Sequence, residues 1–182
     1  MKTITKLHSG DGVESAAVYS PCERYRYSLT RVWDPAEKRL LIVMLNPSKA
    51  TELANDPTVE RCERRARRLG YGAMRVCNIF AWRETRPDRL KRAKDPVGSL
   101  NDAALTEAAE WADHVLCAWG VHGIHRGQGH RVAALLADGS APLFALGETK
   151  AGHPRHPLYV GYKTPPLPWI ADSYAVTRPS TT

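Results

Sequence analysis

Short runs of apolar residues alternate along this sequence with segments of helical periodicity, and this alternation constrains the fold more than any other feature. A parallel strand is buried on both faces and reads as a continuous apolar run, whereas a helix repeats its apolar residues every three or four positions. The expected strands are residues 40–45, 73–81, 115–119 and 143–146, and the expected helices are residues 57–69, 102–112 and 125–137. This order predicts an α/β fold: a single three-layer domain with a mostly parallel central sheet flanked by helices.

The domain boundaries follow from length and composition. The 182 residues suit one domain, which we place at residues 25–169, after an N-terminal segment of residues 1–24 and before an extended or disordered tail of residues 170–182. The alternating run of residues 25–32 adds a strand at the start of the domain. No apolar run is long enough to span a membrane and no apolar signal core is present, so we expect a cytoplasmic protein without a membrane partner.

The helix of residues 57–69 has the clearest ends. Asp56 can cap it, Pro57 fits its first position, and Gly70 suits the position just past its end. Its apolar residues recur at helical spacing and form one narrow stripe, Val59, Cys62, Ala66 and Leu69. The next helix, residues 102–112, is expected to be capped by Asp102.

Polar residues follow or interrupt three of the expected strands, at the edge where parallel sheets bind ligands. Asn46-Pro47-Ser48 ends the first of these strands, Asn78 lies inside the second, and residues 153–159 follow the last. Asn46 is either a turn that closes a strand or an amide held by Pro47 for a water or a ligand. Asn78 needs partners in a buried strand, so it either bonds a neighbouring loop or reads the edge of a bound base.

Two His-Pro steps stand close together late in the chain, with Arg155 between His153 and His156. Proline stiffens such a turn, which can then aim a neutral imidazole at an oxygen that gains charge as a bond breaks. The alternative is a turn with surface histidines. Both interpretations place the segment beside Asn46, beyond the ends of the strands.

No metal or cofactor is expected. His122, His125 and His130 have no carboxylate among them and do not form a facial set on one helix. No CxxC pair occurs, so Cys62, Cys77 and Cys117 are better explained as small buried thiols than as zinc ligands. The sequence contains no Walker loop, GxGxxG or GxSxG motif, which argues against nucleotide hydrolysis, a Rossmann cofactor and serine esterase chemistry.

The basic surplus of the chain lies in one stretch. Residues 60–94 contain twelve Lys and Arg against four Asp and Glu, while the rest of the chain contains fourteen against fifteen. Such a density suits a phosphate backbone, and a solubilising basic face explains it equally well. The candidate phosphate-binding residues are Arg61, Arg64, Arg65, Arg68, Arg83 and Arg86.

Three segments together resemble the motifs of the uracil-DNA glycosylase superfamily. LNPS at residues 45–48 resembles the Gly-x-Asn-Pro-Gly loop of its mismatch-specific branch, VCNI at residues 76–79 resembles the strand with the base-reading asparagine, and HPRHP at residues 153–157 resembles the histidine-proline loop. The stretch of residues 25–169 more closely resembles an uncharacterised bacterial and phage domain of unknown function, distantly related to those glycosylases. The segments that show this resemblance are LNPSKA, NDPTVERC, CNIFAWRET, NDAAL, AWGVHG and GHPRHPLY.

The resemblance implies a fold like that of the glycosylases and a set of roles. Asn46 would position the attacking water, Asn78 would read the flipped base, and His153 or His156 would stabilise the leaving base. The other expected base or substrate contacts are Pro47, Ser48, Phe80, Trp82 and Arg155, and the Arg-rich helix and the loop of residues 83–94 would hold phosphates. Met44-Leu45 replaces the usual glycine, and no carboxylate takes the general-base place. Asp56 could serve as the base if its loop folds inward, but it is better explained as a helix cap.

The expected partner is nucleic acid, DNA in preference to RNA, or a nucleotide. The leading hypothesis is base excision or recognition of a flipped base. A non-catalytic nucleic-acid or nucleotide binder and a hydrolase of free nucleosides or nucleotides are the alternatives. No iron–sulfur cluster is expected, because the cysteine spacing of that branch is missing.

Overall fold

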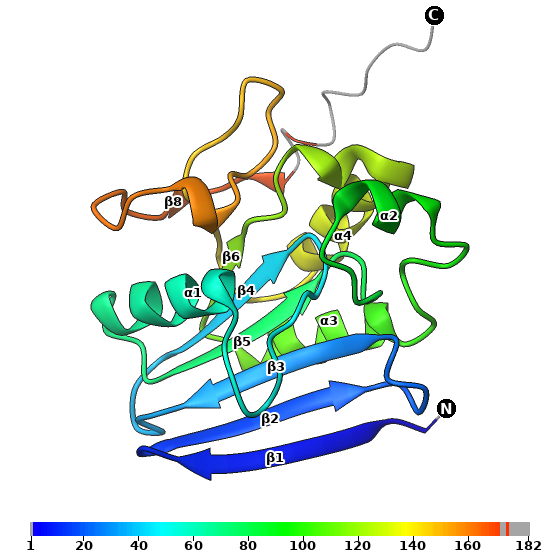
Figure 1. Cartoon of the computed structure of the whole chain (residues 1–182). Helices are drawn as coiled ribbons and strands as arrows, with labels where there is room; N and C mark the ends of the chain where they lie inside the picture. Colours follow the sequence, from blue (N-terminus) through cyan, green and yellow to red (C-terminus); the bar gives the residue numbers. More distant parts are fainter. Residues whose placement is uncertain (1, 172–173, 175–182) are drawn as a thin grey trace, which may run out of the picture.

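The computed structural model describes residues 2–171 and residue 174, and these form an α/β domain with a mixed sheet (Figure 1). The strand order across the sheet is β1-β2-β3-β5-β4-β6-β7-β8. The strands are β1 Ile4–Gly10, β2 Val13–Tyr19, β3 Arg26–Val32, β4 Arg39–Met44, β5 Ala73–Asn78, β6 His114–Cys117, β7 Leu143–Ala145 and β8 Leu167–Pro168. The helices are α1 Pro57–Arg68, α2 Pro87–Arg92, α3 Asn101–Trp111 and α4 Gln128–Ala137, with 3-10 turns η1 Val121–Gly127 and η2 Pro157–Tyr159.

The prediction of a mostly parallel sheet was wrong. β4 pairs in parallel with both β5 and β6, and β6 pairs in parallel with β7. The other neighbouring pairs, β1 with β2, β2 with β3, β3 with β5 and β7 with β8, are antiparallel. The segment of residues 1–24, to which the sequence assigned no strand, supplies β1 and β2 as a hairpin that extends the sheet beyond β3.

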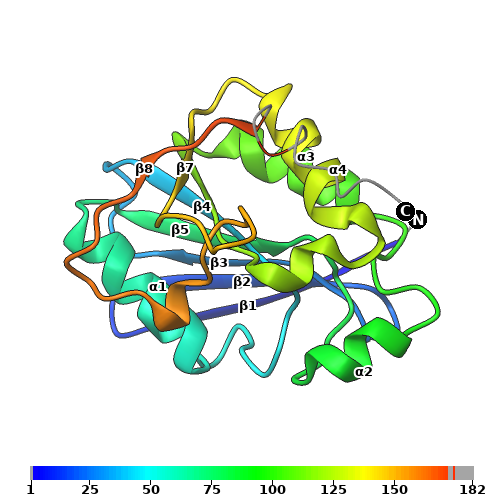
Figure 2. The ribbon, with the colours of Figure 1, turned by 90° about the horizontal axis from the view of Figure 1, so that it is seen from above.

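Helices cover both faces of the sheet, as the three-layer prediction required. Val59, Cys62 and Ala66 of α1 pack on one face with Ile42 and Val76 of the central strands. On the other face, α3 and α4 pack against the same central strands, and their contacts include Leu105, Ala108, Val132 and Leu136. Figure 2 shows α1 on one side of the sheet and α3 with α4 on the other.

Helix α1 begins where the sequence predicted. The Asp56 Oδ1 atom accepts the Val59 N–H at 2.9 Å, and Gly70 has the positive φ of 81° expected just past the end. The predicted apolar stripe was wrong at one position. Leu69 is 42% exposed, whereas Arg65 is only 2% exposed and lies in the face that the stripe should have filled.

Three other boundaries differ from the prediction. The cap of α3 is Leu100, so Asp102 lies inside the first turn. The expected helix of residues 125–137 is divided, because Arg126 and Gly127 both have positive φ and only Gln128 starts α4. The second strand ends at Asn78 rather than at Ala81, and the following loop contains α2.

The remaining predictions concern the cysteines, membrane-spanning helices and the C-terminal tail. Cys62, Cys77 and Cys117 are free thiols in the core, as predicted. In the described residues, no helix combines the length and the apolar character that crossing a membrane requires. Most of the predicted tail, residues 172–173 and 175–182, lies outside the described residues.

Candidate active site

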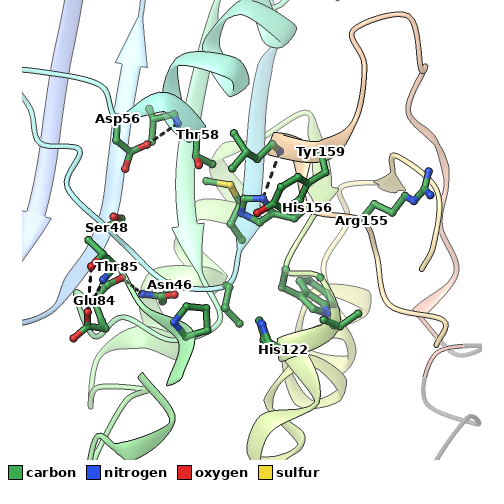
Figure 3. Close-up of a pocket in the computed structure, with 18 of the residues that line it drawn as sticks. Asn46, Ser48, Asp56, Thr58, Glu84, Thr85, His122, Arg155, His156 and Tyr159 are labelled. Atoms are coloured by element: carbon green, nitrogen blue, oxygen red, sulfur yellow. Dashed lines mark hydrogen bonds between the residues drawn. The ribbon is translucent and has the colours of Figure 1, made fainter. Parts of the chain in front are cut away.

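A pocket of about 500 Å³ opens where β4 ends, between the start of α1 and the His-Pro segment (Figure 3). A volume of this size is ordinary for a small-molecule site. Its wall combines residues 44–46 and Ser48 with residues 56, 58 and 59 of the α1 start, and with residues 84, 85 and 87. Residues 119–122, 149, 155–156 and 158–160 complete it, together with Arg26 of β3. The pocket therefore lies at the carboxyl edge of the parallel strands, as the sequence predicted.

Asn46 is held in one orientation at this edge. Its Nδ2 atom donates to the Glu84 carbonyl oxygen at 2.6 Å and to the Pro47 carbonyl oxygen at 3.1 Å. A carbonyl oxygen can accept a hydrogen bond only from the NH2 end of the amide. The Oδ1 atom is therefore the end that points into the pocket (Figure 3). Asn46 therefore offers a fixed acceptor to a ligand or to a water molecule.

His156 lines the same pocket as a neutral imidazole. It precedes η2, and its Nδ1 atom accepts the Leu158 N–H at 3.4 Å. Burial lowers the pKa of His156 to about 4, against the opposite effect of the Asp56 charge. At neutral pH the ring therefore has a single proton, and because Nδ1 accepts, that proton is on Nε2.

His153, the other candidate histidine, is not among the residues that line the pocket. Its side chain is 4% exposed, and its Nδ1 atom lies 2.7 Å from the Tyr174 hydroxyl. The Tyr174 hydroxyl also accepts the Trp119 Nε1–H at 3.3 Å. His153 thus belongs to a buried aromatic cluster behind the pocket, while His156 faces the pocket itself.

The predicted base-binding residues are divided between the pocket and the core. Asn46, Ser48, His156 and Arg155 come together around the pocket. The others, Pro47, Asn78, Phe80 and Trp82, are not part of its lining. Asn78 is 1% exposed, and neither polar atom of its side chain has a hydrogen-bond partner in the described residues. Its predicted base-reading role stays a prediction.

Most of the predicted phosphate-binding arginines have protein partners. Arg61 and Arg65 of α1 donate to main-chain carbonyls of residues 160–164. Arg64 pairs with Glu60, and Arg68 lies over the Tyr162 ring. In the loop after β5, Arg83 donates to the Glu23 carbonyl oxygen and Arg86 pairs with Asp88. The contacts of Arg61, Arg65 and Arg68 join α1 to residues 160–164, and the first of these residues, Val160, lines the pocket.

Several pocket residues were not predicted from the sequence, and two of them are carboxylates. Asp56 lines the pocket as well as capping α1, and its Oδ2 atom also accepts the Ala50 N–H at 3.3 Å. The Glu84 Oε1 atom accepts the N–H groups of Arg86 and Thr85, which hold the pKa of this carboxyl below its usual range. Arg26 was also missed; it is one of two buried arginines of β3, and of the two it alone lines the pocket.

The fold and the pocket define an α/β protein with a ligand-sized site at the carboxyl edge of its central strands. Residues 26–158 match the model of a family described as a protein of unknown function, DUF1643, and the chain belongs to this family. The matched region includes β3 through the His-Pro segment and therefore most of the pocket. Neither a curated protein nor a solved structure matches the chain.

The arrangement suits acid–base and hydrogen-bond chemistry on an organic ligand. In the described part of the chain, no group of three or more His, Cys, Asp or Glu side chains is placed to hold a metal ion. The pocket provides an amide acceptor, a neutral imidazole donor and two carboxylates. These groups can fix the polar edge of a ligand and assist the attack of water on it.

Proposed function

We propose that this pocket binds a nucleobase extruded from nucleic acid, DNA in the first place, and that the chain hydrolyses its N-glycosidic bond. The observation on which the proposal rests is the pairing of a fixed acceptor, the Asn46 Oδ1 atom, with a neutral donor, the His156 Nε2–H, on the wall of one pocket. The resemblance of both segments to the motifs of the uracil-DNA glycosylases supports it. A base must leave the helix stack to reach such a pocket.

The proposed reaction uses each group in a defined way. A water molecule held by the Asn46 Oδ1 atom attacks the sugar carbon, and the bond from that carbon to the base nitrogen breaks. The departing base takes the electron pair, and the His156 Nε2–H donates to the base oxygen on which the negative charge develops. The proton of the water passes to a carboxylate of the pocket. The two carboxylates of the pocket are Asp56 and Glu84, and the N–H groups that lower the pKa of Glu84 weaken it as a base.

The test is a glycosylase assay on oligonucleotides that contain uracil, mismatched thymine, hypoxanthine, or alkylated and oxidised bases. We expect abasic product from at least one of them. Both Asn46→Ala and His156→Ala should lower the rate, and His156→Ala should do so about 10²- to 10³-fold, the usual cost of one donor in an oxyanion site. His8→Ala is the matched control, because His8 is exposed on β1 and should leave the rate unchanged.

Other outcomes would favour a different activity. Salt-sensitive binding of the same oligonucleotides without product would contradict hydrolysis and favour a non-catalytic binder. Release of base from free nucleosides, with none from oligonucleotides, would favour a small-molecule hydrolase. A His153→Ala variant as inactive as His156→Ala, with unchanged stability, would contradict the assignment of the donor to His156.

A further inference from the structure

A buried arginine without an ion pair among the described residues lines the pocket. Arg26 is 2% exposed, and it forms no ion pair with any described carboxylate within 4.0 Å. Its Nη1 atom donates to the Ala50 carbonyl oxygen at 2.7 Å, while its buried Nε atom has no partner among the described residues. Burying a cation in this way is costly unless another group compensates for the lost hydration.

Arg26 stays charged at neutral pH despite its surroundings. Burial lowers the pKa of its guanidinium to about 10, and the charges of Tyr19 and Asp56 act in the opposite direction. A pKa of about 10 still leaves the group protonated at pH 7. The floor of the pocket therefore has a permanent positive charge.

Arg26 is placed near the first turn of α1. Ala50 connects the two: its carbonyl oxygen accepts a hydrogen bond from Arg26, and its N–H donates to Asp56, the cap of α1. Ser48, Asp56 and Thr58 lie together at one end of the pocket, away from Arg155 (Figure 3). The contacts through Ala50 thus place the guanidinium near the capped start of a twelve-residue helix, and Ser48 and Thr58 bring hydroxyl groups to the same end of the pocket.

Asp56 does not remove the need for an anion at this end. Both oxygens of its carboxylate accept main-chain N–H bonds, from Val59 and from Ala50. Its charge is therefore held against the terminus of its own helix, and it forms no ion pair with Arg26. The hydrogen-bonding capacity of Arg26 is left for a ligand.

We propose that this end of the pocket is an oxyanion subsite in which Arg26, Ser48 and Thr58 hold the phosphate of a nucleotide. The pocket then receives a nucleotide rather than a base alone, with the base between Asn46 and His156. The position of the base rests on the proposed function. The phosphate subsite does not, since it is defined by Arg26 and the α1 terminus.

The experiment compares three probes by calorimetric titration of the full chain: deoxyuridine, deoxyuridine 5′-monophosphate and inorganic phosphate. The monophosphate should bind on the order of tenfold more tightly than the nucleoside, since a charge-assisted hydrogen bond is worth about that factor. Inorganic phosphate alone should compete with the monophosphate. In Arg26→Met the monophosphate and the nucleoside should bind equally, whereas Arg64→Met, which removes an exposed arginine outside the pocket lining, should keep the tenfold preference.

Arg26→Met also removes the hydrogen bond to the Ala50 carbonyl oxygen, which contributes to folding. A second variant therefore tests the subsite without that loss. Thr58→Val removes a hydroxyl with little change of shape, and it should lower the preference for the monophosphate severalfold at an unchanged melting temperature. Equal binding of nucleoside and monophosphate by the unmodified chain would overturn the proposal. So would a preference that survives in a folded Arg26→Met variant.

Failure of the subsite and failure of the proposed function give different results. If the base assignment is wrong, inorganic phosphate still binds in an Arg26-dependent manner, and the glycosylase assay gives no product. If the subsite is wrong, phosphate does not bind, while Asn46- and His156-dependent release of base is unaffected.

Discussion

At the scale of single residues, the sequence identified a histidine-proline segment but could not choose between its two histidines. His153 and His156 each precede a proline, so local stiffness does not distinguish them. The choice depends on distant partners: Tyr174 bonds His153 in the core, while η2 fixes His156 at the pocket. Arg26 was missed for a similar reason, since its burial without an ion pair among the described residues is visible only after β3, β4 and α1 have come together.

The lowered pKa of His156 predicts a loss of stability in acid. The unfolded chain binds a proton near the ordinary value of 6.5, and the folded chain only near 4. The free energy of unfolding should therefore fall as pH decreases from about 6.5 to about 4, by at most about 3 kcal/mol from this group. Denaturant unfolding at a series of pH values measures this slope.

A matched pair of variants assigns that slope to His156. His156→Asn retains an acceptor for the Leu158 N–H but does not titrate, so the dependence on pH should become shallower. It should not vanish, because burial also lowers the pKa of His122, His125 and His153. His8→Asn on exposed β1 should leave the slope as it was, and an equal slope in His156→Asn would contradict a buried neutral imidazole.

At the scale of elements, the ends of α1 could be predicted but its packing could not. Capping is local, so Asp56, Pro57 and Gly70 were enough to place the helix. The inward side of the helix contains Arg65, and hydrophobic periodicity excludes a charged residue from such a face. Only the carbonyl groups of residues 160–164, about a hundred positions later in the chain, explain why an arginine is buried there.

Arg65 should therefore hold the pocket wall in place. It donates to the carbonyls of Val160, Gly161 and Thr164, and Arg65→Met leaves these acceptors without their partner. An unsatisfied buried polar group costs about 1–3 kcal/mol, so we expect a loss of stability of at least that size. Hydrogen exchange of residues 158–164 should also become faster. Arg64→Met, on the exposed side of the same helix, should change neither quantity measurably, and equal effects of the two variants would contradict this role.

At the scale of the whole molecule, the alternating pattern predicted the parallel centre of the sheet and missed its antiparallel half. β1 exposes nearly all of its side chains, so its sequence lacks the alternation of apolar and polar residues that marks a half-buried strand. β2 does alternate in burial, but small side chains fill several of its inward positions. The pocket lies at the carboxyl edge, where the sequence placed its candidate residues, because that rule depends on β4, β5 and β6, which were predicted.

The net charge of +7 likewise does not show by itself where nucleic acid would bind. The sequence assigned the phosphate contacts to the arginines of α1 and to the loop of residues 83–94, which contains α2. On α1, Arg64 and Arg67 pair with Glu60 and Glu63. Exposed cations with weaker protein partners lie on α2, which follows the pocket residues Glu84 and Thr85. We therefore expect α2, rather than α1, to contact the backbone of a bound duplex.

Two triple variants, each of which removes three positive charges, test this expectation. Arg89→Gln, Lys91→Gln and Arg92→Gln on α2 should weaken duplex binding and reduce the slope of log Kd against log salt by about 0.9 for every phosphate that the protein no longer neutralises. Arg64→Gln, Arg67→Gln and Arg68→Gln on α1 should have a smaller effect, because two of these charges are already compensated by glutamates. Since both variants change the net charge equally, a nonspecific attraction would give equal slopes. A larger effect from α1 would instead show that the glutamate pairs open on binding and that the backbone follows this helix.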